Sequence, residues 1–181
     1  MSQIFVQDNF FLKEDHLAIC EQMTQIEYTP PDKERLKFHK GSYWHYHPLP
    51  PKHNLKLLIR KLIKQYFNVN VDPHWQDSNY TMVGATDRAR PHIDECLYQC
   101  LIYVMGDEKL NNGTGFYTKE KDGSVQLNTH VGFKQNRAVF FTGGTWHAPL
   151  HPFAKEGESS FRYSITNCFK IIIIRKFFIY R

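Results

Sequence analysis

The spacing of apolar residues changes character at about residue 75 of the chain. Before that point, apolar positions recur every three or four residues over 12–23 and over 53–67, a period that predicts two amphipathic helices. The segment between them is rich in proline and aromatic residues, which favours irregular structure. We therefore expect the N-terminal part to be mostly helix and loop.

After residue 75 the pattern changes to short runs that alternate or are rich in β-branched residues, separated by Gly, Asn and Asp. These runs are 79–85, 96–106, 114–120, 124–133, 137–143 and 161–169. Runs punctuated in this way, with no helical period between them, predict an antiparallel sandwich or barrel. The expected fold class is mainly β with N-terminal helices, that is, α+β.

Length and composition are those of one folded domain. The 181 residues suit a single domain over 1–181, with 1–75 as helical support and 76–181 as the β core. Hydrophobic residues make up 41% of the chain and charged residues 23%, which does not fit a disordered protein. The net charge of +5 is scattered, so a solvated, mildly basic surface is favoured over a nucleic-acid footprint.

The four cysteines, Cys20, Cys96, Cys100 and Cys168, include no CxxC pair, and the N-terminus lacks the pattern of a signal peptide. This usage indicates a reduced, cytoplasmic compartment. Cys96 and Cys100 have no second Cys/His pair at matching spacing, so buried structural thiols are favoured over zinc ligands.

The apolar run at 170–181 is too short for a membrane span, because four isoleucines are followed at once by two basic residues. It predicts a terminal strand. Packing on the sheet and contact with a second subunit both remain open for it.

A candidate metal site begins at His92 and Asp94, which stand two residues apart in the stretch RPHIDE. In an extended segment, residues i and i+2 point to the same side and can reach one ion together. An H-x-D triplet alone is a weak signal. The rival pair His45 and His47 has no carboxylate close behind it, so we interpret these two as loop residues at a substrate entrance.

A third ligand is expected from a later strand, and His147 follows the run 137–143 and its Gly-Gly turn. Two histidines and one carboxylate that leave other positions open suit a non-haem Fe(II) ion, which binds a chelating cosubstrate and oxygen. On the run 161–169, Arg162 and Ser164 share a face. An inward arginine needs an anion, and its planar fork matches a carboxylate, so the pair predicts an acid clamp.

These pieces stand in one order along the chain: His92 with Asp94, then a strand, a Gly-Thr-Gly-Phe-Tyr turn at 113–117, then His147, then Arg162 with Ser164. In this order the sequence resembles the 2-oxoglutarate- and Fe(II)-dependent oxygenases, specifically the small members related to prolyl hydroxylases. The resemblance covers about 78–168, and the N-terminal helices match the usual layout of the family.

The resemblance implies a double-stranded β-helix, the jelly-roll or cupin-like barrel, with Fe(II) held by His92, Asp94 and His147. It implies 2-oxoglutarate on the metal, with its far carboxylate on Arg162 beside Ser164. Molecular oxygen would convert the cosubstrate to succinate and carbon dioxide while a peptide side chain or a small molecule is hydroxylated. The protein's share of this chemistry is geometry and a dry pocket.

Relatives often carry a tyrosine or another hydroxyl residue on an early strand that also contacts the cosubstrate. Tyr80, Tyr98 and Tyr103 are candidates, and we favour Tyr80, although strand phase is not readable from sequence. Trp146 and Asn167 lie near the site in sequence, and for both we expect a packing role.

Two other functions stay open. One is a cupin-like protein that binds a metal or small ligand without catalysis, an alternative that the presence of Arg162 disfavours. The other is an oxidative demethylase of alkylated nucleic-acid bases, which the basic charge allows but the absence of a Lys/Arg-dense strip disfavours. The primary substrate lies on variable loops in such folds, so the sequence does not name it.

Overall fold

The computed structural model describes residues 3–28, 45–84, 90–108, 113–150 and 161–171. In chain order its elements are β1 (Ile4–Gln7), α1 (Lys13–Thr24), β2 (His45–Pro48), α3 (Asn54–Phe67), β3 (Val71–Gly84), β4 (Tyr98–Met105), β5 (Gly113–Lys119), β6 (Val125–Gly132), β7 (Arg137–Thr142), β8 (Trp146–Pro149) and β9 (Phe161–Ile171). Both predicted helices are present, with ends within one residue of the expected ones. Within the described ranges, neither is long and apolar enough to cross a bilayer.

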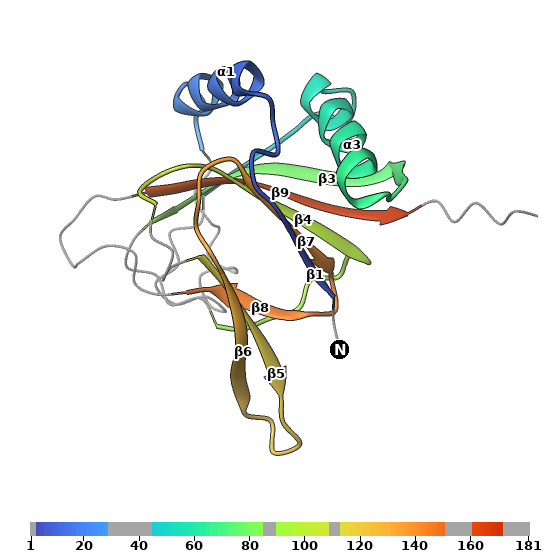
Figure 1. The fold of residues 1–181 in the computed structure, drawn as a ribbon, viewed down its shortest axis with the longest axis vertical. Helices are drawn as coiled ribbons and strands as arrows, with labels where there is room; N and C mark the ends of the chain where they lie inside the picture. The colour runs from blue at the N-terminus through green and yellow to red at the C-terminus, as the bar shows by residue number, and fades with distance from the viewer. Residues whose placement is uncertain (1–2, 29–44, 85–89, 109–112, 151–160, 172–181) are drawn as a thin grey trace, which may run out of the picture.

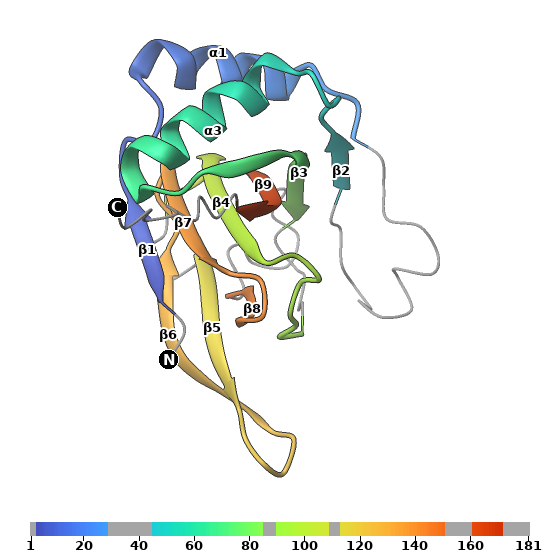
Figure 2. The same cartoon turned by 90° about the vertical axis from the view of Figure 1, so that its right-hand side faces the viewer.

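The strands form two antiparallel sheets that face each other (Figure 1). The larger has the order β1-β7-β4-β9-β3-β2, and the smaller has the order β6-β5-β8. Figure 2 shows the β5–β6 hairpin extending beyond the body of the molecule. This arrangement confirms the expected jelly-roll barrel, and it leaves a space between the sheets into which alternate residues of each strand point.

The N-terminal part contributes strands as well as helices, which the sequence reading did not predict. Strand β1 pairs with β7 at one edge of the large sheet and β2 pairs with β3 at the other. His45 and His47 therefore lie in an edge strand, not in a loop. Each of these strands has four residues, too few for a period to be visible. Similarly, the expected turn at 113–117 lies within β5.

The C-terminal strand β9 ends at Ile171, so most of the apolar run 170–181 lies outside the described residues. The described end of the run, Lys170 and Ile171, continues the strand as expected.

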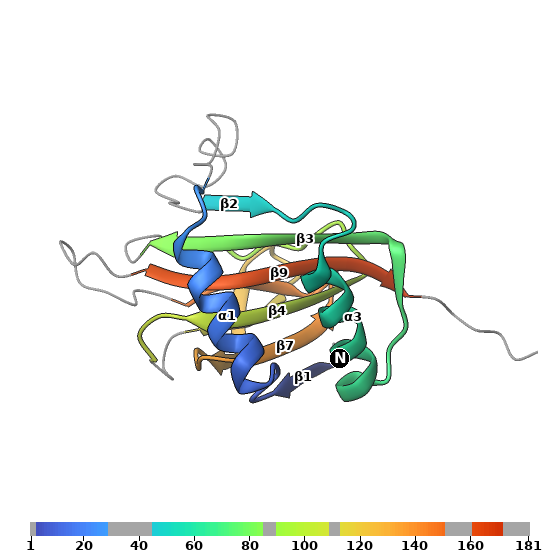
Figure 3. The same cartoon turned by 90° about the horizontal axis from the view of Figure 1, so that it is seen from above.

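Both helices cover the outer face of the large sheet (Figure 3). Ile19 and Met23 of α1 and Ile59 and Ile63 of α3 are buried in one apolar cluster with the outward residues of the sheet. Those sheet residues include Tyr80, Cys100, Ile102, Val104, Ala138, Phe140, Ile165 and Phe169. The helices thus lie against the barrel, as one-sided helices of this length require.

Asn167 also lies on this outer face and is fully buried. Its Nδ2 donates to the Cys100 carbonyl at 3.0 Å, and its Oδ1 accepts from the Ser78 hydroxyl at 2.7 Å. The packing role expected for Asn167 is therefore confirmed.

We propose that helices and sheets form one folding unit, and Ile59 tests this. Ile59 is 0% exposed, so Ile59→Ala should lower the free energy of unfolding by about 2–5 kcal/mol in a single transition. Leu57 on the same helix is 53% exposed, and Leu57→Ala should change the free energy of unfolding by less than about 0.5 kcal/mol. Urea unfolding followed by circular dichroism and by tryptophan fluorescence measures both. Separate transitions for the two probes would contradict a single unit.

A charged cluster ties the end of β1 to the sheet. Arg137 Nη2 and Lys134 Nζ lie 3.1 Å and 2.9 Å from Asp8 Oδ2. The hydrogen bond from Arg137, together with Lys134, outweighs burial and lowers the pKa of Asp8 to about 2. Folding therefore favours the ionised form of the Asp8 carboxylate. In the unfolded chain an aspartate has a pKa near 4.

A depressed pKa stabilises the fold above the unfolded pKa, and this stabilisation is lost as the pH falls through the folded pKa. Asp8→Asn should therefore lower the free energy of unfolding at pH 7, by only about 1 kcal/mol because the side chain is 35% exposed. The difference from wild type should shrink as the pH falls from about 4 towards 2. Urea unfolding across this range measures it, with Glu120→Gln on an exposed turn as control. A difference independent of pH would rule out the ion pair as its cause.

Candidate metal and cosubstrate site

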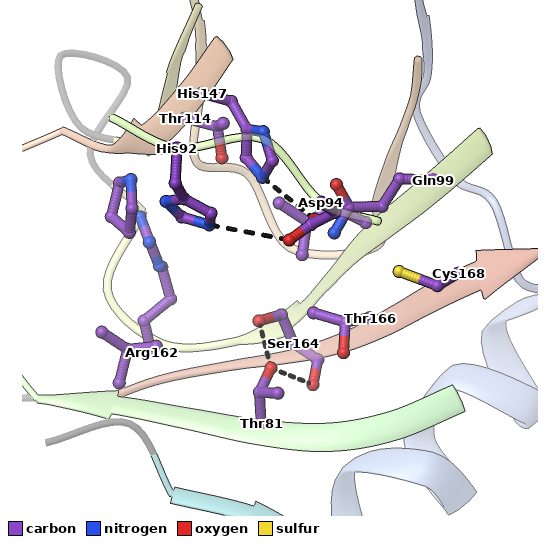
Figure 4. A pocket seen from close by; sticks show the side chains of 13 residues that line it. Thr81, His92, Asp94, Gln99, Thr114, His147, Arg162, Ser164, Thr166 and Cys168 are labelled. Atoms are coloured by element: carbon purple, nitrogen blue, oxygen red, sulfur yellow. Dashed lines mark hydrogen bonds and ion pairs between the residues drawn. The ribbon is translucent and has the colours of Figure 1, made fainter. Parts of the chain in front are cut away.

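His92, Asp94 and His147 converge at one point between the sheets (Figure 4). His92 and His147 form an isolated antiparallel bridge, with backbone N–H groups donating to each other's carbonyls at 3.0 and 2.9 Å. The Asp94 carboxylate lies between their rings, with Oδ1 3.8 Å from His92 Nε2 and Oδ2 3.4 Å from His147 Nε2. One ligand atom from each residue lies within 4.8 Å of the others. The three residues singled out from sequence are therefore brought together.

Both imidazoles are held in the tautomer that a metal ligand needs. His92 Nδ1 lies 3.0 Å from the Arg90 carbonyl, and His147 Nδ1 lies 2.9 Å from the Thr145 carbonyl. A carbonyl only accepts, so each Nδ1 carries the proton and donates it. Nε2 of each ring is left facing the Asp94 carboxylate, so it donates a proton there when the imidazole is charged and can bind a metal when the imidazole is neutral. Anchoring of Nδ1 on a backbone carbonyl is the second-sphere arrangement typical of metal-binding histidines.

Gly143 fixes the segment that carries Asp94. Its carbonyl accepts from the Asp94 N–H at 3.1 Å, and its N–H donates to the Leu97 carbonyl at 3.0 Å. A Cβ at Gly143 would stand 1.8 Å from the Cys96 carbonyl oxygen, so only glycine fits here. The Gly-Gly turn before His147 therefore does more than end a strand: its hydrogen bonds hold the segment that carries Asp94 in place.

Burial by itself would raise the pKa of Asp94, but the net shift is downward. The hydrogen bond and charge of His147, then the charge of His92 and a hydrogen bond from Gln99, lower the pKa below the usual range of an aspartate. The carboxylate is thus kept ionised, the form that binds a cation.

A cavity of about 150 Å³ opens in front of these three residues. Its described lining is Thr81, Val83, His92, Asp94, Gln99, Leu101, Thr114, His147, Pro149, Arg162, Ser164, Thr166 and Cys168. Alternate residues of β9, from Arg162 to Cys168, face the cluster in a row across the cavity (Figure 4). The period of two along β9 explains why Arg162 and Ser164 point inward together.

Arg162 is 5% exposed and packs between aromatic rings. Its guanidinium carbon lies 5.7 Å from the centre of the Tyr103 ring and 5.6 Å from that of Phe133. Its Nη1 donates to the Gly113 carbonyl at 3.0 Å. Burial lowers the pKa of Arg162, opposed by Tyr103, yet an arginine stays protonated in proteins. A buried cation therefore borders a cavity in which Asp94 is the sole acidic residue among the described lining.

Tyr80 does not lie at this cavity, and the preference for it is wrong. Its side chain points to the helices, where the hydroxyl donates to Gln22 Oε1 at 2.9 Å, and burial raises its pKa to about 12. The next residue, Thr81, takes the inward position. Its Oγ1 lies 2.9 Å from Ser164 Oγ and donates to the Ser164 carbonyl at 3.0 Å. A phase error of one residue moves a side chain to the opposite face of the strand.

The other two tyrosine candidates also occupy structural positions. Tyr98 stacks with Phe140 on the helix side, at a centroid distance of 5.9 Å. Tyr103 faces inward, but its hydroxyl donates to Thr114 Oγ1 at 2.7 Å. Trp146 is half-buried, and the Nζ of Lys119 lies 5.0 Å from its ring centre.

Several lining residues were not assigned to the cavity from sequence, among them Gln99, Thr114, Thr166 and Cys168. Gln99 is 5% exposed, and its Oε1 has no hydrogen-bond partner among the described residues. For Thr166 and Cys168 a signal existed, because they continue the parity of Arg162 and Ser164 along one strand. Thr114 belongs to the motif at 113–117, but the phase of its strand was unknown, and for Gln99 no signal existed.

No protein-family model and no curated protein sequence matches the chain. Solved structures do match. A prolyl-4-hydroxylase from Pseudomonas putida superposes with a TM-score of 0.62 at 14% identity over 94% of both chains. HygX from Streptomyces hygroscopicus, with nickel, 2-oxoglutarate and hygromycin B bound, gives a TM-score of 0.65 at 8% identity over 93% of this chain and 82% of its own.

A third match is SnoN, a non-heme alpha-ketoglutarate-dependent epimerase from nogalamycin biosynthesis, with a TM-score of 0.58 at 9% identity over 93% of this chain and 78% of its own. Identities this low show the fold. The chain therefore has the jelly-roll fold of the 2-oxoglutarate- and Fe(II)-dependent oxygenases, the family that the order of its motifs resembles.

Proposed function

We propose that the protein is an Fe(II)- and 2-oxoglutarate-dependent oxygenase that hydroxylates a peptide side chain or a small molecule. The observation that carries this proposal is the pairing of His92, Asp94 and His147 with the buried Arg162 across one small cavity. A metal cluster alone fits many proteins, and a buried arginine alone fits many anions. Both facing one cavity fit a ligand that is a metal chelator at one end and a carboxylate at the other.

The donor set suits Fe(II). Two imidazole Nε2 atoms and one carboxylate, on adjoining segments, leave the cavity side open for other ligands. Bound there, iron with 2-oxoglutarate would activate oxygen, which oxidises the cosubstrate to succinate and carbon dioxide and places one oxygen atom on the substrate. The part of His92, Asp94 and His147 is to hold the ion in a fixed orientation through their backbone-anchored rings and carboxylate.

The opposite wall suits the far carboxylate of 2-oxoglutarate. We assign Arg162 as its partner, because a guanidinium binds a carboxylate through two parallel hydrogen bonds. The hydroxyls of Ser164 and Thr81, 2.9 Å apart, line the same wall. The proton of Thr81 donates to the Ser164 carbonyl, so the Ser164 hydroxyl is the one that can turn its proton towards the acid. A carboxylate here would accept charge-assisted hydrogen bonds from the buried guanidinium.

Cavity size bears on where the primary substrate binds. At about 150 Å³ the cavity is well below the roughly 300–1,000 Å³ of sites for drug-sized ligands. It suits one small acid, so the primary substrate is expected to enter only with its reacting group. Val83, Leu101 and Pro149 supply apolar lining that excludes water from the reacting groups.

Structural neighbours support the same proposal. HygX holds nickel, 2-oxoglutarate and hygromycin B, and SnoN is alpha-ketoglutarate dependent. A prolyl hydroxylase and a protein that binds a small molecule together support a peptide or small-molecule substrate for this chain.

A succinate screen tests the proposed activity. The protein is incubated with Fe(II), 2-oxoglutarate and oxygen against sets of peptides, amino acids, small metabolites and alkylated oligonucleotides. We expect succinate release that rises with a peptide or small molecule, together with one added oxygen atom in that substrate by mass spectrometry. Omission of Fe(II) should abolish both signals.

Other outcomes assign the rival functions. Succinate release stimulated by alkylated oligonucleotides, with loss of the alkyl group, would make the protein a nucleic-acid demethylase. Metal binding without 2-oxoglutarate binding or succinate release would make it a cupin-like binder.

A further inference from the structure

A second group of ligand atoms adjoins the first. Asp94, Cys96 and Cys168 each offer one ligand atom, and these three atoms lie within 4.8 Å of one another. Both cysteines are free thiols and only partly buried. Cys168 also lines the cavity, next to Asp94 at the far end of the row that begins with Arg162 (Figure 4).

The backbone sets this arrangement. Cys168 continues the inward parity of β9, so its thiol points between the sheets. Cys96 lies two residues after Asp94, in the segment that hydrogen bonds at residues 94 and 97 clamp to Gly143. Because Gly143 has no side chain, the Cys96 carbonyl packs directly against it. This close packing and the two hydrogen bonds hold the segment in one place. The two thiols therefore meet at a defined point of the fold.

The donor chemistry differs from that of the iron site. Two thiolates and a carboxylate suit a zinc-group cation, whereas two imidazoles and a carboxylate suit Fe(II). Zn–S bonds of about 2.3 Å in a tetrahedral site put two sulfurs roughly 3.8 Å apart. The present separations, up to 4.8 Å, need to close by only about an ångström to reach this geometry.

We propose that Asp94, Cys96 and Cys168 form a second metal site that takes a thiophilic divalent cation such as Zn²⁺ or Cd²⁺. The site shares Asp94 with the iron site, and this shared role rests on the proposed function above. A cation on the thiols draws the Asp94 carboxylate towards them and away from His92 and His147. Occupation of the second site thus weakens metal binding at the first.

Cadmium titration of the full chain tests the site, under nitrogen and with a non-thiol reductant. Cadmium bound to thiolate absorbs in the ultraviolet through sulfur-to-metal charge transfer. We expect a saturable band in the wild type, at least halved in Cys96→Ala and in Cys168→Ala. Cys100→Ala is the matched control, because Cys100 is fully buried in the cluster under the helices. The control should keep the wild-type band.

Absence of the band in the wild type overturns the proposal, and so does an unchanged band in both Cys96→Ala and Cys168→Ala. A measurement on wild-type protein alone guards against variants that misfold. Cadmium should slow alkylation of Cys96 and Cys168 by about tenfold or more, read by mass spectrometry of peptides. Cys20, which lies beside His16 on α1, is the internal reference and should react at an unchanged rate. Equal protection of all three cysteines, or of none, contradicts a defined site.

The two proposals fail separately. If cadmium binds the thiols but the Fe(II) protein binds no 2-oxoglutarate, the second site stands and the oxygenase function falls. If 2-oxoglutarate binds but cadmium gives no thiolate band, the oxygenase function stands and the second site falls. A third measurement addresses the shared carboxylate: at cadmium just sufficient to saturate the thiolate band, the fall in Mn²⁺ affinity should be at least severalfold larger in the wild type than in Cys96→Ala, where cadmium competes with Mn²⁺ only at the histidine site.

Discussion

His147→Ala should lower the affinity for Mn²⁺, a non-oxidising stand-in for Fe(II), by more than about 100-fold, because loss of an outer-shell partner alone costs roughly 10- to 100-fold. The site as proposed has three protein ligands, and His147 Nε2 is the one nearest to Asp94, at 3.4 Å from Oδ2. Asp94→Asn should have a similar effect, since it removes the negative charge that the ion needs. Calorimetry or electron paramagnetic resonance of free Mn²⁺ measures both variants.

The matched control is His130→Ala, an exposed histidine on β6 away from the lining of the cavity. It should bind Mn²⁺ like the wild type. Wild-type affinity in His147→Ala, with the fold intact by circular dichroism, would remove this residue from the metal site and with it the proposed function.

Arg162→Ala should weaken binding of 2-oxoglutarate to the Mn²⁺-loaded protein by about 30-fold or more, since a lost partner of a buried charge costs on the order of 2 to 5 kcal/mol. The affinity of Arg162→Lys for 2-oxoglutarate should lie between those of the wild type and Arg162→Ala, because lysine keeps the charge and loses the planar fork. Calorimetric titration measures the three affinities. Metal affinity should change little, because Arg162 lies across the cavity from His92, Asp94 and His147.

Two controls isolate the role of the guanidinium. Arg60→Ala removes an arginine from α3, whose Nη1 donates to Gln76, and should leave the affinity for 2-oxoglutarate unchanged. Pyruvate has the chelating keto-acid end and no far carboxylate, so its weaker binding should be similar in wild type and Arg162→Ala. An equal loss of pyruvate and 2-oxoglutarate binding would mean that Arg162 supports the fold of the site instead of holding the acid.

Much of the site was predictable because its signals are local. The period of two puts His92 with Asp94 and Arg162 with Ser164 on common sides, whatever the rest of the fold does. The helices were predictable for the same reason, since a period over a dozen residues survives without knowledge of the neighbours.

What failed depends on pairing between distant segments. Tyr80 and Thr81 differ by one position, and pairing of β3 with β9 decides which faces the cavity: Thr81 stands opposite Ser164. The short strands β1 and β2 exist because sheet edges pair with them, and four residues carry no period of their own. The approach of Cys168 to Cys96 likewise arises from the sheet, because the register puts Cys168 opposite Gln99, near the start of β4.

Addition of 2-oxoglutarate to the anaerobic Fe(II) protein tests whether metal and cosubstrate bind together at His92, Asp94 and His147. A keto acid that chelates Fe(II) gives a metal-to-ligand charge-transfer band in the visible range, and neither component gives it alone. We expect this band to appear in the wild type, to saturate at one 2-oxoglutarate per iron, and to be absent in His147→Ala. A wild-type protein that binds Fe(II) and shows no band at saturating 2-oxoglutarate would contradict the proposed oxygenase function.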